Sequence, residues 1–446
     1  MPWARYRQPL LLAAALDGVG LVGLTCLISQ IQNQSLDLGN SMVIKLLLVL
    51  VTIYCSFGWL FGSYTLLKLR RMGWRTSLSR LGTTALASIL LAIVLSYTLR
   101  LQISTSLFFR SSLIPLFLLL SIWSALVRVC LRQLLSKPDH LLERWRIVAL
   151  PNEVEQLTQA WNLGLTASAP IPTITFPGGT GYEATNTTES IAISSGAIHC
   201  LDMQEFCQAA VNKGQQVKTL VDLAEQELQR IPSQWITDQW LVFSDRIDGI
   251  GFKPSKQLKR YGDVFISLFL FTLTSPILAL TALLVKLEDG GPVIYRQTRT
   301  GLLGQTFQIL KIRTMRTDAE KSGARWAEIS DQRITKIGYW LRISRLDELP
   351  QLINVIRGEM SLIGPRPERP EMEKILDKQI PNYRLRHWLR PGLSGWAQVN
   401  MPYSSSVEDA ELKLSYDLFY VRNASFWLDL LILAKTVKTV LKAAGR

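Results

Sequence analysis

The sequence has few cysteines for its length, and none of them is spaced like a paired site. Five cysteines are scattered over 446 residues without a C-x-x-C pair. The sequence therefore predicts neither a disulfide framework nor a zinc site. Internal repeats and low-complexity tracts are also missing from the sequence.

Acidic residues are scarce relative to basic ones. The chain has 35 Asp and Glu against 49 Lys and Arg, which gives a formal net charge of +14, and 48% of its residues are hydrophobic. A chain that is both apolar and basic is expected to lie partly in lipid and to meet anionic partners such as phosphates or lipid headgroups. Nucleic acid is the rival partner, but much of the positive charge stands beside apolar segments, so we predict no nucleic-acid partner.

Lys and Arg are absent between the first two of four long apolar runs. These runs cover residues 10–31, 43–64, 82–99 and 113–129, each near the ~20 residues that cross a bilayer as a helix. Basic residues gather at their other ends, so the positive-inside rule predicts four transmembrane helices with both chain termini in the cytoplasm. Asp17, inside the first run, is costly in lipid and is predicted to face another helix, with a functional role as the alternative.

A fifth apolar run, residues 264–285, has basic residues on both flanks and contains Ser275-Pro276. Proline removes a backbone donor and clashes with the preceding turn, so a kink is expected there. An ordinary crossing would send many Lys and Arg residues outside. The pattern predicts a re-entrant, kinked helix at about 264–286, with an ordinary fifth span as the alternative.

The segment between the membrane runs and the fifth run is soluble in character. Residues 147–150, 173–176, 191–194 and 240–243 are predicted strands, and residues 203–212 and 217–228 are predicted helices. This alternation predicts a small α/β domain with a parallel sheet. The turn after its first strand lacks glycine, and the glycines at 178–181 are wrongly spaced for a dinucleotide site. We expect a structural or regulatory module, followed by a linker at 245–255.

The strongest local pattern of charged residues is LRISRLDELPQLINVIR at positions 341–357. Pro350 suits the first turn of a helix, so Asp347 and Glu348 are predicted at or just before its N-terminus. Backbone N–H groups and the helix dipole favour phosphate there, and Arg342 stands nearby. One carboxylate could attack phosphorus while a divalent cation neutralises charge. A helix cap without chemistry is the alternative.

Other charged residues of the last third have two interpretations each. Lys311 and Arg313 share one face of a predicted strand, which meets either a phosphate or water. Arg366 is held between Pro365 and Pro367, so it is either a rigid phosphate or base clamp or a surface residue of a stiff loop. Residues 390–399 are predicted to form a stiff turn that enters a strand. Residues 426–442 are predicted to form either an amphipathic interfacial helix or a packed core helix.

These motifs, in this order from about residue 256 to the C-terminus, resemble the bacterial sugar transferase superfamily. Its members are polyprenyl-phosphate hexose-1-phosphate transferases, also described as monotopic phosphoglycosyl transferases. Four spans and a middle α/β segment resemble the long-form members. The resemblance implies three domains: a four-helix transmembrane domain at 1–138, a degenerate Rossmann-like cytoplasmic α/β domain at 139–250, and a monotopic catalytic domain at 251–446.

The resemblance also implies residue roles. Asp347 and Glu348 match the catalytic dyad and would hold Mg²⁺, and Arg342 matches an active-site arginine. The remaining matches are Pro365, Arg366 and Pro367 for holding the nucleotide sugar, Lys259 and Arg260 with Asp263 before the membrane helix, and Ser275-Pro276 for the helix break. We assign substrate or phosphate binding also to Lys259, Arg260, Lys311 and Arg313, and a structural role to Asp263, Ser275 and Pro276.

The predicted function is transfer of hexose-1-phosphate from a UDP-hexose to undecaprenyl phosphate, with UMP released. Asp347 would form an aspartyl-phosphosugar intermediate, with Mg²⁺ as the cofactor, at the cytoplasmic face of the bacterial inner membrane. UDP-glucose or UDP-galactose is the expected donor, for exopolysaccharide, capsule or O-antigen synthesis. The alternatives are a non-catalytic export or regulatory component of a polysaccharide system and a nucleotide-sensing membrane receptor. The oligomeric state stays open, with a homodimer as one option.

Overall fold

The computed structural model divides the chain into two compact units, Met1–Arg144 and Trp145–Arg446, which are described separately. The structure describes residues 8–33, 39–64, 74–98, 110–135, 145–162, 173–176, 190–200, 202–237, 254–317, 319, 331, 333–401 and 406–441. As predicted, the described chain is mostly helical, with several long apolar helices and smaller α/β parts.

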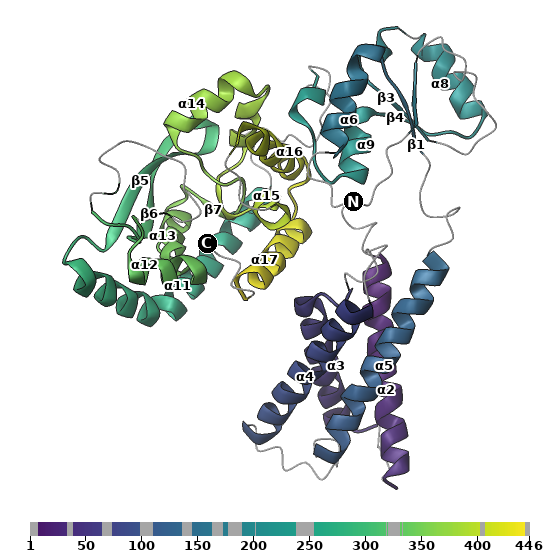
Figure 1. Cartoon of the computed structure of the whole chain (residues 1–446), viewed down its shortest axis with the longest axis vertical. Coiled ribbons are helices and arrows are strands. Elements are labelled where there is room, and N and C mark those ends of the chain that lie inside the picture. The colour runs from purple at the N-terminus through teal and green to yellow at the C-terminus, as the bar shows by residue number, and fades with distance from the viewer. Residues whose placement is uncertain are drawn as a thin grey trace. The chain divides into compact units, whose positions relative to one another are not determined.

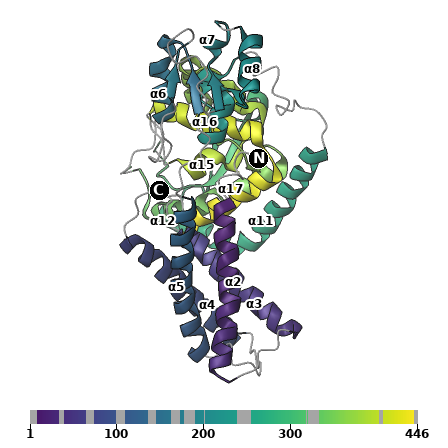
Figure 2. The same cartoon turned by 90° about the vertical axis from the view of Figure 1, so that its right-hand side faces the viewer.

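The described residues of the first unit form apolar helices that lie side by side (Figure 1, Figure 2). They are α2 (Gln8–Ile31), α3 (Ser41–Phe61), α4 (Trp74–Thr98) and α5 (Arg110–Leu135). Leu21, Leu50 and Phe117 belong to their shared core, whereas leucines such as Leu11 and Leu48 are exposed on the outside. Apolar residues on both sides of a helix are typical of membrane spans. By length and composition, five described helices could cross a membrane: these four and α11 in the second unit.

A buried ion pair joins the first and last helices of this unit. Arg128 Nη2 of α5 lies 3.0 Å from Asp17 Oδ2 of α2, and Ser124 Oγ donates to Asp17 Oδ1 at 2.7 Å. The Arg128 Nε also donates to the carbonyl oxygen of Ser63 at 3.0 Å. Asp17 therefore faces another helix, as predicted, and its charge is compensated inside the unit.

The second unit begins with a four-stranded parallel sheet, which we call the middle module (residues 145–237). Its strands lie in the order β2-β1-β3-β4. The elements are β1 (Trp145–Val148), α6 (Val154–Asn162), β2 (Thr173–Thr175), β3 (Ser190–Ile193), α7 (Ser195–Ile198), α8 (Met203–Asn212), β4 (Val217–Thr219) and α9 (Leu220–Glu227). The structure thus confirms the parallel α/β arrangement. The predicted strand at 240–243, the glycines at 178–181 and the linker before Pro254 lie outside the described residues.

The predicted helix over 217–228 is wrong in its first turn. Val217–Thr219 forms the strand β4, paired with β3, and the helix α9 begins only at Leu220. The Thr219 side chain accepts the backbone N–H of Asp222 at 3.2 Å and so caps the helix. An N-cap residue has extended backbone angles, which allows the strand to run directly into the helix.

The carboxylate of Glu153 lies at the C-terminal ends of the strands β1 and β3 in the middle module. It accepts the backbone N–H of Leu150 at 2.9 Å, the hydroxyl of Ser194 at 2.5 Å and the backbone N–H of Gly196 at 3.1 Å. Ligands of open α/β sheets bind at this end of the strands. Here the protein's own carboxylate takes these donors, in agreement with the missing glycine turn.

The rest of the second unit, residues 254–441, is called the C-terminal module below. Its helices and strands are α11 (Pro254–Asp289), β5 (Ile294–Thr300), β6 (Thr306–Ile312), α12 (Lys336–Ser344), α13 (Gln351–Arg357), β7 (Ser361–Ile363), α14 (Pro370–Gln379), β8 (Gly392–Ser394), α15 (Trp396–Asn400), α16 (Val407–Asn423) and α17 (Phe426–Leu441). The hairpin β5–β6 is antiparallel, and β7 pairs in parallel with β8.

The stiff turn predicted at 390–399 leads into a shorter strand than expected. β8 covers only Gly392–Ser394, and residues from Trp396 onward form the helix α15. Trp396 is almost fully buried and its ring stacks on Phe419, with 5.6 Å between centroids. Burying this large aromatic ring against α16 favours the helical turn over a longer strand.

The helix α11 has its polar side toward the protein and its apolar side outward. Asp263, Ser267 and Thr281 are buried against the module, together with Val285. The exposed large apolar side chains are Leu258, Tyr261, Phe265, Ile266, Leu268, Phe269, Leu273, Ile277, Leu280, Leu283, Leu284 and Leu287. Such a surface is stable only in contact with lipid or another apolar partner.

Both halves of α11 contact the same module. Ser361 Oγ of β7 donates to Asp263 Oδ2 at 2.6 Å near the start of the helix. Near its end, Val285 packs in one cluster with Ile312 and Leu341. The backbone stays helical through Pro276, so the helix is not interrupted at the expected break.

Candidate active site

A sharp reversal of the backbone sets the position of the acidic pair Asp347-Glu348. The helix α12 is capped by Thr335 at its N-terminus and by Arg345 at its C-terminus. Arg345 has a left-handed backbone conformation, with a φ of 60°. A single 3-10 turn, η6 (Leu346–Glu348), follows, and Pro350 then starts α13. A non-glycine residue in the left-handed region costs on the order of 1 kcal/mol or more, and such strain gathers at functional sites. The acidic pair therefore stands just before a helix N-terminus, as predicted.

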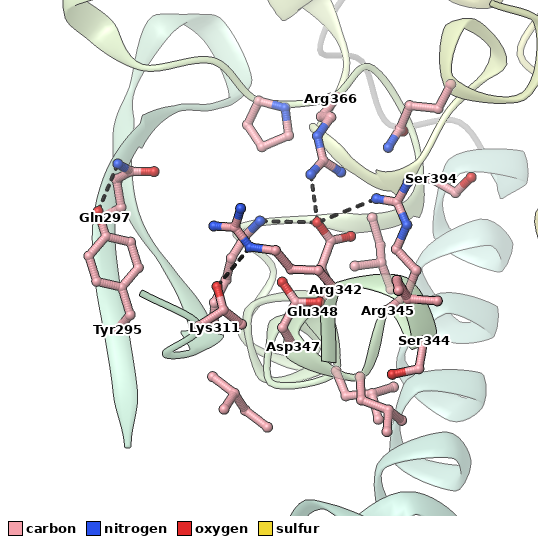
Figure 3. Close-up of a pocket in the computed structure, with 18 of the residues that line it drawn as sticks. Tyr295, Gln297, Lys311, Arg342, Ser344, Arg345, Asp347, Glu348, Arg366 and Ser394 are labelled. Atoms are coloured by element: carbon pink, nitrogen blue, oxygen red, sulfur yellow. Dashed lines mark hydrogen bonds and ion pairs between the residues drawn. The ribbon is translucent and has the colours of Figure 1, made fainter. Parts of the chain in front are cut away.

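Glu348 is the centre of an ion-pair cluster. Its Oε1 lies 2.6 Å from Arg366 Nη2, 3.0 Å from Lys311 Nζ and 3.9 Å from Arg345 Nη1. These cations come from the loop after β7, from β6 and from the end of α12 (Figure 3). Burial acts to raise the pKa of Glu348, but the charges of Arg366 and Lys311 outweigh it and hold the pKa well below its ordinary value. Glu348 is therefore a carboxylate at neutral pH.

Asp347 has different surroundings, although it is the next residue in the chain. It is buried, and within the described part of the chain its Oδ1 has no hydrogen-bond partner. Burial, and then the charge of Glu348, raise its pKa to about 6. A carboxylate without hydrogen bonds is a stronger nucleophile than a solvated one, so Asp347 is the better candidate for attack on an electrophile.

The two carboxylates line a large cavity, of about 2420 Å³, with an excess of positive charge. Four acidic residues line it: Asp331, Asp347, Glu348 and Glu368. Eleven basic residues line it: Arg299, Lys311, Arg313, Arg316, Arg333, Lys336, Arg342, Arg345, Arg366, Arg369 and Lys413. A concave surface of this sign attracts anions such as a diphosphate. The cavity also reaches Leu270 of α11 and Val437 of α17, so it borders the apolar helix.

Several predicted site residues meet in this cavity. Asp347, Glu348, Arg342, Lys311, Arg313, Arg366 and Pro367 all line it. Arg342 Nε donates to Thr314 Oγ1 at 2.9 Å, which fixes its guanidinium beside the dyad. Arg313 pairs with Asp289 at the end of α11. It therefore ties the hairpin to the membrane-type helix in addition to lining the cavity.

The structure does not bring Lys259 and Arg260 to the cavity. Lys259 Nζ lies 2.5 Å from Asp429 of α17, and Arg260 donates to the carbonyl oxygens of Val355 and Ile356 at 2.6 and 2.8 Å. Those carbonyls are at the C-terminus of α13, where a cation is favoured. Both residues anchor α11 to the module, and their role in substrate binding stays a prediction. Asp263 accepts the hydroxyl of Ser361, and Pro365, Ser275 and Pro276 are not among the described residues that line the cavity. The roles assigned to these four residues stay predictions.

The sequence interpretation missed a group of buried charges behind Arg366. Arg386 Nη2 donates to the backbone carbonyl of Arg366 at 2.8 Å and to Asp417 Oδ2 at 2.7 Å. Glu368 accepts from Lys413, whose charge, with that of Arg386, overcomes the effect of burial and lowers the Glu368 pKa to about 2. A signal was present: Lys413 and Asp417 are spaced i,i+4 and alternate with the apolar residues Leu412, Leu414, Tyr416 and Leu418. Charges in such a stretch are rarely buried without partners.

Mg²⁺ fits this arrangement only as an ion shared with a substrate. Among the residues that the structure describes, no group of three or more His, Cys, Asp or Glu side chains could hold a metal. The dyad offers the unpartnered Asp347 Oδ1 and the second oxygen of Glu348. Mg²⁺ is commonly held by one or two carboxylates together with substrate phosphates, so the donor set is compatible with it.

In comparisons with known proteins, residues 254–443 match the family described as "Bacterial sugar transferase". The chain is 44% identical over 188 residues to the UDP-N-acetylgalactosamine-undecaprenyl-phosphate N-acetylgalactosaminephosphotransferase of Aeromonas hydrophila, covering 42% of this chain and 44% of the relative. It is 43% identical over 185 residues to the UDP-glucose:undecaprenyl-phosphate glucose-1-phosphate transferase of Caulobacter vibrioides, covering 41% of this chain and 69% of the relative. The matched region thus spans less than half of the Aeromonas protein.

Proposed function

The chain belongs to the bacterial sugar transferase family, and on this premise we propose that it transfers a hexose-1-phosphate from a UDP-hexose to undecaprenyl phosphate, releasing UMP. The observation that carries the proposal is a buried Asp347, whose Oδ1 has no hydrogen-bond partner among the described residues, beside an ionised Glu348 in a strongly basic cavity. The names of the relatives describe UDP-sugar donors and undecaprenyl-phosphate acceptors. Both substrates carry phosphates, which suit this cavity.

Asp347 is the proposed nucleophile. Its Oδ1 attacks the β-phosphorus of the UDP-hexose, the bond from that phosphorus to the bridging oxygen breaks, and UMP leaves with the electron pair. An aspartyl-phosphosugar remains on the enzyme. A phosphate oxygen of undecaprenyl phosphate then attacks the same phosphorus, the phosphorus–Asp347 bond breaks, and the carboxylate is restored. Two transfers at one residue predict ping-pong kinetics.

The cations around Glu348 have a binding role in this proposal. Lys311 and Arg366 are held by the carboxylate of Glu348 at 3.0 and 2.6 Å, so their N–H groups are oriented before substrate arrives. Donors fixed in advance stabilise developing phosphate charge without reorganisation in the transition state. Arg342 and Arg345 extend the same positive surface along the cavity.

Mg²⁺ is the proposed cofactor, with Asp347 and Glu348 as the residues that would hold it. When bound, it would reduce the repulsion between the carboxylates and the incoming diphosphate. The site residues can orient the donor by themselves through Lys311 and Arg366, because both cations are already in place.

We further propose that α2, α3, α4 and α5 span the bacterial inner membrane, with both termini and the C-terminal module in the cytoplasm. α11 would then be re-entrant, since both of its halves contact the same module and its exposed side is apolar. The cavity borders α11 at Leu270 and Thr274, so a lipid phosphate at the membrane surface can reach the dyad. Glucose or galactose is the proposed sugar, and polysaccharide initiation the proposed role.

The decisive experiment is UMP release by the purified full chain from a panel of UDP-sugars, with and without undecaprenyl phosphate. We expect Asp347→Asn to lose both UMP release and covalent labelling by a radiolabelled donor, by on the order of 10³-fold or more. Asp377→Asn is the matched control, because Asp377 pairs with the exposed Arg384 on the surface of α14. Near-normal transfer by Asp347→Asn would refute the assignment of the nucleophile.

The same assay tests the alternative function. A non-catalytic export or regulatory component would release no UMP from any donor in the panel. Wild-type protein with undecaprenyl phosphate present should instead release UMP in proportion to the lipid-linked product.

A further inference from the structure

The helix α16 presents two opposite charged or polar faces to two different parts of the second unit. Lys413, Asp417 and Tyr420 are spaced i, i+4 and i+7, so they share one face of a helix that turns about 100° per residue. Glu411, Ser415 and Arg422 share the opposite face, roughly 180° away by the same spacing. Most residues between Ala410 and Asn423 are buried, in agreement with a helix that is covered on both sides.

The first face supports the loop that carries Arg366, residues 364–368, called the Arg366 loop here. Asp417 accepts from Arg386, which in turn donates to the backbone carbonyl of Arg366 at 2.8 Å. Lys413 pairs with Glu368 at the end of the same loop. Arg386 and Asp417 are 2% and 1% exposed, so this support is shielded from water and cannot easily rearrange.

The Arg366 loop contacts the acidic pair Asp347-Glu348 through the side chain of Arg366. Arg366 Nη2 donates to Glu348 Oε1 at 2.6 Å, inside the basic cavity. A fixed backbone at Arg366 therefore fixes one of the cations that meet Glu348. Small displacements of such groups are costly in catalysis, since about 1 Å can change a rate by about 10²-fold.

The second face of α16 receives the middle module. Ile231 donates its backbone N–H to the carbonyl oxygen of Ser415 at 2.8 Å. Glu225 of α9 is buried between Arg422 Nη1 at 2.9 Å and Asn423 Nδ2 at 2.6 Å, and Asp222 accepts from Arg422 at 2.9 Å. The elements α9 and α16 are labelled in Figure 1. A buried carboxylate held by two donors fixes the end of α16 to the middle module.

We propose that the middle module is an intramolecular brace for the donor site, with Glu225 as a positioning residue that acts through α16 and Arg386 on the Arg366 loop. Each link is a hydrogen bond or an ion pair between described residues. The inference rests on the proposed function only in taking the Arg366 loop as part of the UDP-sugar site. It gives the middle module a mechanical role that needs no ligand of its own.

The test compares full-length wild type with Glu225→Gln in the same detergent or nanodisc. We expect KM for the UDP-sugar to rise about fivefold, because the substitution acts on the Arg366 loop through a packed network and not by direct contact with the substrate. KM for undecaprenyl phosphate should stay unchanged. The matched control is Gln234→Ala, which removes a hydrogen bond of 2.7 Å between the middle module and Glu411 of α16 at an exposed site, and should leave both KM values unchanged.

Two further measurements separate positioning from a general loss of stability. Amide hydrogen exchange in peptides covering 361–372 should become faster in Glu225→Gln, while the melting temperature stays near that of the control. The double variant Glu225→Gln with Arg386→Lys should show non-additive changes in donor KM, since both substitutions act on one loop.

The brace is overturned if Glu225→Gln leaves both the donor KM and the exchange of 361–372 at wild-type values. It is also overturned if both KM values rise together with a fall in melting temperature. Hydrogen exchange is measured without substrate, so it tests the brace even if wild-type protein releases no UMP. That last result would count against the proposed function alone.

Discussion

Asp347 and Glu348 are adjacent in the chain, yet their surroundings shift their pKa values in opposite directions. Glu348 pairs with Lys311 and Arg366, whereas Asp347 is a mostly buried residue of the cavity wall that lies close to the charge of Glu348. Two carboxylates with separated pKa values are able to take two different roles, here nucleophile and organiser of cations. The spacing of Pro350 and the arginines predicted where the pair lies. It could not assign the roles, because the cations that decide them come from β6 and from the Arg366 loop.

Glu368 provides a prediction about acid stability. Burial opposes its ionisation, but Lys413 and Arg386 lower its pKa in the folded state from 4.5 to about 2. A depressed carboxyl pKa stabilises the fold above the unfolded pKa, and this stabilisation is lost as the pH falls through the window from about 4.5 to 2. Wild type should therefore melt at a higher temperature than Glu368→Gln at pH 7, and the difference should shrink as the pH falls below about 4.5.

The measurement is a series of thermal melts between pH 3 and pH 7. The control is Glu371→Gln, on the exposed start of α14, which should follow wild type throughout. A difference between Glu368→Gln and wild type that is constant over this range would contradict the ion-pair explanation.

At the scale of elements, periodicity predicted most helices and strands and failed where tertiary contacts decide. The helix α8 has the predicted bounds, Met203–Asn212, and the strands β1, β2 and β3 lie where apolar runs indicated. Val217–Thr219 is a strand because β3 offers a partner, and Trp396–Asn400 is a helix because Trp396 packs on Phe419. Neither partner is near in sequence, so no local pattern could have revealed them.

The helix α11 provides a prediction about topology. Its two ends contact one module, so both flanks should lie on the same side of the membrane. In a chain whose five cysteines are replaced by serine, single cysteines at Leu258 and Leu287, each 72% exposed, should both react with an impermeant maleimide in inside-out vesicles. Neither should react in intact spheroplasts, where Asn33→Cys, between the first two spans, should be labelled. Labelling of Leu287→Cys in spheroplasts would show an ordinary crossing.

At the scale of the whole chain, every described residue that lines the cavity with the dyad lies between Leu270 and Thr439, within the second unit. A chain of residues 145–446, kept in detergent, should therefore form the covalent donor adduct at a rate within roughly twofold of the full chain, as expected for independent parts. Labelling of both proteins with radiolabelled UDP-sugar measures this. The shortened chain has to show the same melting transition as the second unit of the full protein. If such a chain forms no covalent donor adduct, the first unit takes part in the chemistry.

The arrangement of parts was the least accessible to the sequence. Composition and charge indicated membrane helices, a soluble middle segment and a catalytic region, and the predicted boundaries at 138 and 250 stay predictions. Contacts such as Glu225 with Asn423 join residues almost two hundred positions apart. The sequence shows which residues are charged, but it does not show which of them form pairs. The pairing depends on how the modules pack.

The exposed leucines and phenylalanines of α11 determine in which medium the folded protein is stable after it leaves the cell. Twelve large apolar side chains are exposed on this one helix. These side chains are 38–74% exposed. At 1.5–3 kcal/mol for a fully exposed side chain, their transfer out of water is therefore worth roughly 10–20 kcal/mol. This is as large as the 5–15 kcal/mol that typically separates a folded domain from its unfolded chain. If α11 lies in the membrane as proposed, the bilayer acts as a structural component of the C-terminal module. Any purification then has to supply an amphiphile before the lipid is removed.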